Sequence, residues 1–396
     1  MSSKLGTIVM GIRTPIIKEG DNLANIVVES VLEASNLENI EIEDRDIIAI
    51  TEAVVGISEG NYATIDQIAE DLRNKIDTKH IGIVFPILSR NRFAVLLKAF
   101  ARTSEKITCL LSYPSDEVGN DILQKERLAE YNIDPYKDII TEEEYKTRFG
   151  DFKHIFTGVN MIDFYREVAT SENCEINFIL SNNPEEITKY TKNILVCDIH
   201  SREETKEKIK KIQNTNVVGI DEILNNSING SGYNEKYGLL GSNRATEDKV
   251  KLFPRAGEEL VNKVQEMIKE HTGKTVEVMV YGDGAFKDPV GKIWELADPV
   301  VSPAYTKGLE GSPNELKLKY LSDNKYNKLK GEELSEAIKK EIKEKEQNLK
   351  GKIETQGTTP RRYVDLIGSL CDLTSGSGDK GTPVVYIKNY FKNYAD

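Results

Sequence analysis

The sequence predicts an α+β fold, with mixed or antiparallel sheets flanked by helices and an α/β subdomain inserted between the two halves. Short apolar runs typical of strands alternate with helical patterns at both ends of the chain, and a different rhythm of strands and polar stretches occupies the middle. The length of 396 residues also suggests two or three domains. We therefore expect three segments, residues 1–79, 80–224 and 225–396, of which the first and last form one domain.

The first segment alternates extended and helical patterns. Asp21 or Asn22 can cap a helix whose apolar residues, beginning with Leu23, recur at helical spacing. The predicted elements are a strand at residues 6–12, a helix at 21–37, a strand at 46–55 and a helix at 64–75.

The middle segment opens on a strand at residues 81–88, after which Ser89 can cap a helix at 90–102. Arg90 and Arg92 at the start of this helix could hold an anion, such as an acidic substrate, although such charges more often form a solvated helix face. Further strands are predicted at residues 107–111, 176–180 and 194–199. This alternation is typical of a small α/β subdomain.

The third segment begins with a loop at residues 225–244 that is dense in Gly, Ser and Asn but holds apolar anchors. Such a loop is typical of a structured functional loop, and its backbone amides could cradle an anion. The elements expected after it are a helix at residues 257–270, a strand at 276–281, a charged amphipathic helix at 323–352, a helix at 363–373 and a strand at 384–387.

An acidic turn follows the strand at residues 276–281. It displays Asp283, Asp288, Glu295 and Asp298 directly after an apolar run. Hard cations such as Mg²⁺ and Mn²⁺ prefer oxygen ligands and hold nucleotide phosphates through one or two carboxylates, so the turn is a candidate metal-phosphate site. The alternative is that Asp and Gly simply form a turn.

A second Gly-rich loop lies between the helix at residues 363–373 and the strand at 384–387. It is not a P-loop, because it connects helix to strand and carries Gly381 after Lys380 instead of Ser or Thr. Lys380, Ser377 and Gly378 could nevertheless contact phosphate or carboxylate oxygens. An ordinary Gly-rich turn is an equal alternative.

Composition excludes several classes of function. A formal net charge of -12 disfavours general binding to nucleic acid or to anionic membranes. The four cysteines show no CxxC spacing, which leaves a zinc site or redox pair without support, and we expect them to be buried apolar residues. The start of the chain resembles no signal peptide and no run is long enough to span a bilayer, so we expect a cytoplasmic protein.

The ordered set of these motifs resembles the coenzyme F-420-0:L-glutamate ligase family, whose members join glutamate to a deazaflavin cofactor using GTP. The resemblance covers roughly the first 75 residues and those after 225, and it leaves the middle segment outside. It rests on residues 11–23, on residues 46–60, on Gly238-Leu-Leu-Gly-Ser-Asn, on Leu252-Phe-Pro-Arg, on Tyr281-Gly-Asp-Gly and on Gly378-Asp-Lys-Gly-Thr-Pro-Val-Val.

Departures from the family pattern put its function in doubt here. Leu240 stands where the family has an acidic residue, so one expected metal ligand is missing. The family's usual lysines fall on Ala53 and Ile57, and its arginine falls on Asn61. Asp283 is retained.

The resemblance implies a set of site residues. Asp283 and Lys380 are the candidate catalytic residues, and Asp283, Asp288 and Glu295 are the candidate ligands of Mg²⁺ or Mn²⁺. The candidate nucleotide contacts are Ser242, Asn243, Arg244, Gly284, Ser377 and Gly378.

The implied activity is a ligase, related to coenzyme F-420 biosynthesis, that binds GTP or ATP and adds glutamate or another amino acid to an acidic small molecule through an acyl phosphate. The foreign middle segment favours an acceptor other than the deazaflavin. The alternative is a noncatalytic protein that binds a nucleotide or metabolite on the same fold; Leu240 favours this alternative, whereas Asp283 favours catalysis. The family resemblance also implies a homodimer.

Overall fold

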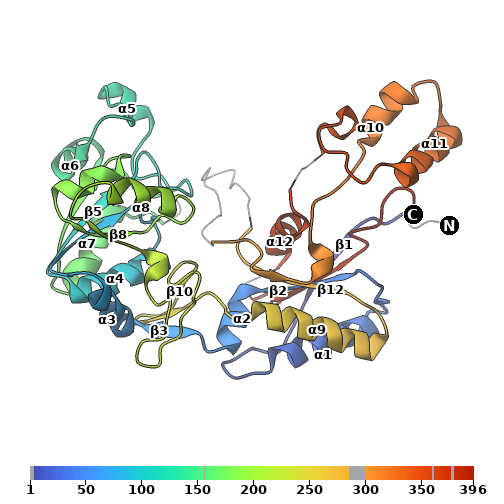
Figure 1. Ribbon diagram of the computed structural model, residues 1–396, viewed down its shortest axis with the longest axis horizontal. Helices are drawn as coiled ribbons and strands as arrows, with labels where there is room; N and C mark the ends of the chain where they lie inside the picture. Colours follow the sequence, from blue (N-terminus) through green and yellow to red (C-terminus); the bar gives the residue numbers. More distant parts are fainter. Residues whose placement is uncertain (1–3, 156, 285–298, 359–360, 376–378) are drawn as a thin grey trace.

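A computed structural model describes the chain except for residues 1–3, 156, 285–298, 359–360 and 376–378. It confirms the α+β fold. The described strands form three sheets of five, three and six strands. Figure 1 shows the six-stranded sheet and its helices on one side and the five-stranded sheet on the other, with the two chain ends close together beside the latter.

The five-stranded sheet combines strands from both ends of the chain. Its order is β1 (Ile8–Ile12), β14 (Val384–Lys388), β2 (Ile47–Thr51), β12 (Glu277–Tyr281) and β13 (Ala304–Tyr305). β2 and β12 are parallel neighbours, with Thr51 opposite Tyr281, whereas β14 runs antiparallel to β1 and β2. The carboxyl ends of β2 and β12 therefore meet at one edge of the sheet.

Both faces of this sheet are buried, which explains why its strands are almost continuously apolar. Ile48 and Val278 point toward the core beneath α1 (Leu23–Leu37) and α9 (Gly257–Thr272). Ile47 precedes Ile48 and Met279 follows Val278, and both point toward α12 (Tyr363–Thr374) on the opposite face. This alternation is the two-residue period of a strand.

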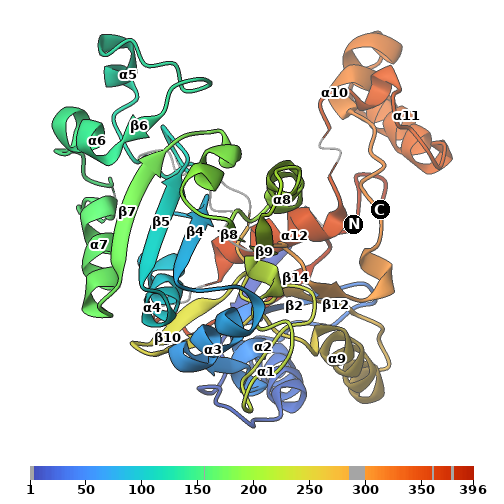
Figure 2. The ribbon, with the colours of Figure 1, turned by 60° about the vertical axis from the view of Figure 1, so that its left-hand side comes forward.

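The six-stranded sheet lies in the middle of the chain. Its order is β6 (Ile140–Thr141), β7 (Glu175–Leu180), β5 (Lys106–Leu111), β4 (His80–Val84), β8 (Asn193–Val196) and β9 (Asn216–Gly219). All pairs are parallel except that of β6 with β7, and the ladder is visible edge to edge in Figure 2. α4 (Phe93–Thr103) and α7 (Met161–Ser171) cover one face, and α8 (Arg202–Lys210) covers the other.

A small sheet connects the two larger ones. It contains β10 (Asn243–Thr246), β11 (Lys249–Lys251) and β3 (Tyr62–Thr64), and it leads directly into α3 (Ile65–Lys75). Thr64 and Gln67 form a capping box at the start of α3, and this helix packs in the same core as the six-stranded sheet.

Shorter elements complete the described structure. They are α2 (Glu52–Ser58), α5 (Glu126–Glu130), α6 (Glu142–Phe149) and α10 (Leu318–Tyr320), with short 3-10 or π-helical segments at Pro184–Lys189, Ile220–Glu222, Lys307–Leu309, Leu321–Lys325 and Ile353–Thr355. The longer helix α11 (Gly331–Glu344) lies near the C-terminal end of the sequence. Among the described helices, none has the length and apolar character needed to cross a membrane.

Most predicted elements are confirmed within two residues at their ends, but the strand predicted at 46–55 is wrong in its second half. β2 ends at Thr51, and Glu52–Ser58 forms helix α2. The β-branched Val54 and Val55 favoured a strand, yet these residues pack against the core from a helix.

Other predicted elements are longer than the observed ones. The strand predicted at 81–88 ends at Val84, because Phe85 adopts a positive φ of 53° and Pro86 follows. The helix predicted at 90–102 begins only at Phe93, and the strand at 194–199 ends at Val196.

The charged helix predicted at 323–352 is also shorter, since the regular helix α11 covers only Gly331–Glu344. Its buried residues are Ile338 and Ile342, which contribute with Leu321 to a small separate core. The prediction of four buried cysteines is confirmed. The boundaries of the three predicted segments stay a prediction.

A buried ion pair joins the small sheet to the five-stranded sheet. The ammonium of Lys251 on β11 lies 2.8 and 3.0 Å from the two carboxylate oxygens of Glu52, which follows β2. The side chains are only 8% and 6% exposed, so neither charge is well hydrated. Each charge therefore depends on the other for its stability in the interior.

A buried carboxylate fixes the loop between β4 and α4. Asp116 accepts hydrogen bonds from the backbone amides of Leu88, Val118 and Asn120 at 2.8, 3.1 and 2.8 Å, and from the Asn120 side chain at 2.8 Å. Burial nevertheless raises the pKa of Asp116 to about 6, against the lowering effect of these hydrogen bonds. The bond to Leu88 holds the segment that leads to Ser89 and Arg92.

We expect Lys251→Met to lower the free energy of unfolding by about 3–5 kcal/mol, because it leaves Glu52 buried without its counter-ion. The double variant Glu52→Gln/Lys251→Met should recover most of this loss. Urea denaturation followed by circular dichroism measures both values, with Lys249→Met on the same strand as the control. Equal stability of the single and double variants would contradict the paired role.

We expect Asp116 to make the protein less stable as the pH rises from about 4 to about 6.5. Its folded pKa lies above the ordinary value, so its contribution to stability is fully present below the unfolded pKa and is lost as the pH rises through the folded pKa. The change is on the order of 2–3 kcal/mol. Urea titrations of wild type and Asp116→Asn across this range test it; parallel pH profiles would exclude the effect.

Candidate functional site

The carboxyl ends of parallel strands from the two large sheets meet at one junction. β2 and β12 deliver Glu52 and Asp283, and β4 leads into the segment that carries Arg92. The guanidinium of Arg92 forms an ion pair with the carboxylate of Asp283, across 191 residues of sequence. Two residues that the sequence suggested for separate roles, acid recognition and metal binding, thus contact each other.

Local hydrogen bonds fix the segment before Arg92. The hydroxyl of Tyr165 accepts a hydrogen bond from the Ser89 amide at 2.7 Å, and the Ser89 hydroxyl accepts one from the Arg92 amide at 3.1 Å. Ser89 therefore caps a turn that precedes α4, not the helix itself. The Arg92 side chain is 13% exposed, whereas Arg90 is exposed.

The predicted nucleotide contacts at residues 242–244 lie against the same segment. The amide of Arg244 donates a hydrogen bond to the carbonyl of Asn91 at 2.8 Å. Ser242 is buried, and its hydroxyl has no hydrogen-bond partner among the described residues. Asn243 lies opposite Lys251 in the β10–β11 ladder, and the exposed Arg244 side chain donates to the carbonyl of Thr246 at 3.3 Å.

A glycine turn positions Ser242. Gly238 has a φ of 51°, and an added Cβ there would lie 2.2 Å from the carbonyl oxygen of Asp221. Gly241 has a φ of 71°, and a Cβ would lie 2.7 Å from the Phe253 ring. Only glycine fits both positions without displacement of the surrounding chain.

Gly284 packs closely against α12 beside Asp283. Its amide donates a hydrogen bond to the Asp372 carboxylate at 3.0 Å, and an added Cβ would lie 2.8 Å from the Cα of Ser369. The side chain of Tyr281, the last residue of β12, is buried near the same helix, and burial raises the pKa of its hydroxyl. The acidic turn therefore begins from a closely packed strand end.

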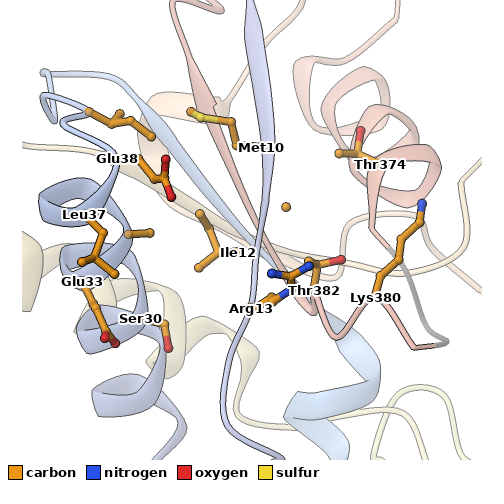
Figure 3. Close-up of a pocket in the computed structure, with 13 residues that line it drawn as sticks. Met10, Ile12, Arg13, Ser30, Glu33, Leu37, Glu38, Thr374, Lys380 and Thr382 are labelled. Carbon is orange, nitrogen blue, oxygen red and sulfur yellow. The ribbon is translucent and has the colours of Figure 1, made fainter.

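Lys380 lies at the same sheet edge as Asp283, because it precedes β14 while Asp283 follows β12. β2 alone separates β14 from β12, so these two strands lie roughly 10 Å apart. Lys380, Arg13 and Thr382 line a hollow of ≈ 880 Å³ around the edge strand β1. Figure 3 shows Lys380 on one side of β1 and Glu33, Leu37 and Glu38 on the other.

The described residues do not form a divalent metal site on their own. Asp283 is paired with Arg92, Glu52 is paired with Lys251, and no group of three His, Cys, Asp or Glu residues in the described part of the chain could hold a metal. Asp288 and Glu295 lie outside the described residues, as do Ser377 and Gly378. Their predicted roles stay predictions.

The sequence did not single out Glu52 or Lys251, and it marked Asn61 only as a departure from the family pattern. Asn61 is buried, accepts a hydrogen bond from the Tyr233 amide at 2.9 Å and donates to the Phe253 carbonyl at 2.8 Å. It holds the Gly-rich loop against the segment after β11. A carboxylate directly after an apolar strand was the signal used for Asp283, and the same signal would have identified Glu52.

The family-model comparison matches residues 11–389 to F420-0:Gamma-glutamyl ligase. The match runs through the middle segment, so the similarity is wider than the sequence motifs indicated. A search of curated proteins found no match. Because the match spans nearly the whole chain, this protein belongs to the F420-0:gamma-glutamyl ligase family.

Proposed function

We propose that the protein uses GTP or ATP to join an amino acid, glutamate or another, to the carboxyl group of an acidic small molecule. Membership of a γ-glutamyl ligase family supports amide-ligase chemistry. The observation that carries the proposal within this chain is the meeting of Arg92, Asp283 and the Ser242 segment at the carboxyl ends of parallel strands. Ligands of α/β sheets bind at such ends.

The proposed reaction has two steps. An oxygen of the acceptor carboxylate attacks the γ-phosphorus, the bond to the β-phosphate oxygen breaks, and a nucleoside diphosphate leaves. The amine of the second substrate then attacks the acyl carbon; the C–N bond forms, the C–O bond to phosphate breaks, and inorganic phosphate and one proton are released. Both steps need fixed positive charge near the phosphoryl oxygens.

Lys380 is the residue we assign to this charge, and we assign Arg92 to the acceptor carboxylate that becomes the acyl phosphate. Arg92 is held in place by Asp283 and by the Ser89 turn, so its guanidinium is oriented before a substrate binds. Lys380 is exposed at the same sheet edge, where it can reach a phosphate chain that extends from the junction. The Ser242 hydroxyl is a further donor beside Arg92, and its lack of a partner among the described residues supports a contact with the acceptor.

The divalent metal stays a prediction. A metal at Asp283 would supply charge neutralisation for the nucleotide, but the described carboxylates at this edge are already paired with cations. The homodimer and the cytoplasmic location likewise remain predictions.

A noncatalytic nucleotide- or metabolite-binding protein is the second candidate. Leu240 favours it, because this buried apolar side chain lines the cavity beside Arg92 where the family resemblance leads us to expect an acid. Turnover separates the two candidates, since a binding protein forms neither acyl phosphate nor amide.

We expect Asp283→Asn to lower the rate of acyl phosphate formation at least tenfold, because Arg92 loses the ion pair with Asp283 that orients it. The assay traps the acyl phosphate with hydroxylamine during incubation with ATP or GTP, Mg²⁺ and a panel of small carboxylic acids. Nucleotide binding by calorimetry, with Mg²⁺ or with EDTA, shows whether Asp283 is a metal ligand.

Asp248→Asn is the matched control, because Asp248 is an exposed acid at the β10–β11 turn that pairs with Lys98 at 2.6 Å. Full activity of Asp283→Asn would contradict the central role that we assign to Asp283 in the proposed site. Nucleotide binding without any product from wild type would favour the noncatalytic candidate.

A further inference from the structure

A small apolar cavity lies behind Arg92. Its walls come from the segments that follow β4, β8 and β9, with Ile87, Cys197, Ile199 and Ile220 among the lining residues, and from Leu240 in the Gly-rich loop. Its volume is ≈ 30 Å³, about the space of one water molecule or one methyl group. It is the apolar extension of the junction that holds Asp283.

The cavity occupies the switch point of the six-stranded sheet. The chain leaves β4 to form β5 on one side, and β8 pairs with β4 on the other side. Loops on the two sides therefore diverge at the carboxyl ends of β4 and β8. In open parallel sheets, this divergence opens the crevice in which ligands bind.

Two polar groups converge on the apolar walls. Arg92 and Ser242 both line the cavity. The Ser242 residue is only 3% exposed, and its hydroxyl has no hydrogen-bond partner among the described residues. Buried polar atoms in proteins are normally hydrogen-bonded, so this hydroxyl can satisfy its hydrogen-bonding capacity with a ligand atom. A mostly apolar pocket with a few convergent polar groups is typical of a small-molecule site.

We propose that this cavity is the acceptor site and that the acceptor is a short aliphatic carboxylic acid. Arg92 and Ser242 hold the carboxylate, and the cavity takes a methyl or ethyl group. The inference rests on the proposed function and gives its acceptor a chemical class. Leu240 sets the depth of the cavity, since its side chain forms part of the wall beside Ser242.

The cavity size makes the site selective for chain length. Acetate fits without movement of the walls and propionate with a small one, whereas butyrate requires larger displacement of buried side chains. One methylene more or less in a protein pocket changes recognition by roughly 10- to 200-fold. Shortening Leu240 should therefore move the preference toward longer acids.

The experiment compares acetate, propionate, butyrate and valerate by NMR titration of the full-length protein. Wild type should bind the two shorter acids at least tenfold more tightly than valerate. In Leu240→Ala the ratio of butyrate to acetate affinity should rise at least tenfold. Leu97→Ala is the matched control, because Leu97 is buried on α4 but does not line the cavity. Ile220→Val, a smaller change in the wall, should shift the preference in the same direction.

Ser242→Ala should weaken the binding of all four acids by a similar factor without changing the order of their affinities. The proposal is overturned if wild type binds none of the acids, or if the order stays the same in Leu240→Ala and Ile220→Val. Length-selective binding without product would sustain the acceptor site and contradict the ligase. Product formation with an unchanged length preference would support the ligase and contradict the acceptor site.

Discussion

The ion pair between Arg92 and Asp283 is the contact on which the junction of the two large sheets depends. Parallel strands end at a common edge, so the loops after β2, β12 and β4 gather where these edges face each other. A largely buried guanidinium needs a counter-ion, and Asp283 supplies it. An incoming anion must join or replace Asp283 on Arg92, and a cation that binds Asp283 must compete with Arg92. A ligand that bound to either residue would therefore alter the contact between the two sheets.

Local patterns in the sequence predicted most of the fold. The two-residue period of buried strands and the cap at Asn22 depend on neighbouring residues, and the structure confirms this cap. The strand-end rule also drew attention to Asp283, which contacts Arg92 between the two large sheets. These features could be read from the sequence because each arises within a few residues of chain.

The remaining features depend on contacts between distant residues. β2 ends at Thr51, where Lys251 provides a buried partner for Glu52 from 199 residues away. The strand at β4 ends where Phe85 adopts a positive φ, a conformation that bulky residues rarely take. The family resemblance leads us to expect an arginine at position 61. The Asn61 side chain is instead buried, and its hydrogen bonds link two loops. No local period or composition carries this information.

The charges near Arg92 indicate what the replacement of an acid by Leu240 changes at the junction. The described residues here form two ion pairs, Arg92 with Asp283 and Lys251 with Glu52. An acid at position 240 would add a negative charge beside Arg92 and would repel an acceptor carboxylate unless a cation bound as well. Leucine adds no charge and gives the cavity an apolar wall. Under the proposed function, the loss of the expected acid would favour carboxylate binding at the junction, and Lys380 would have to supply the charge that neutralises phosphate.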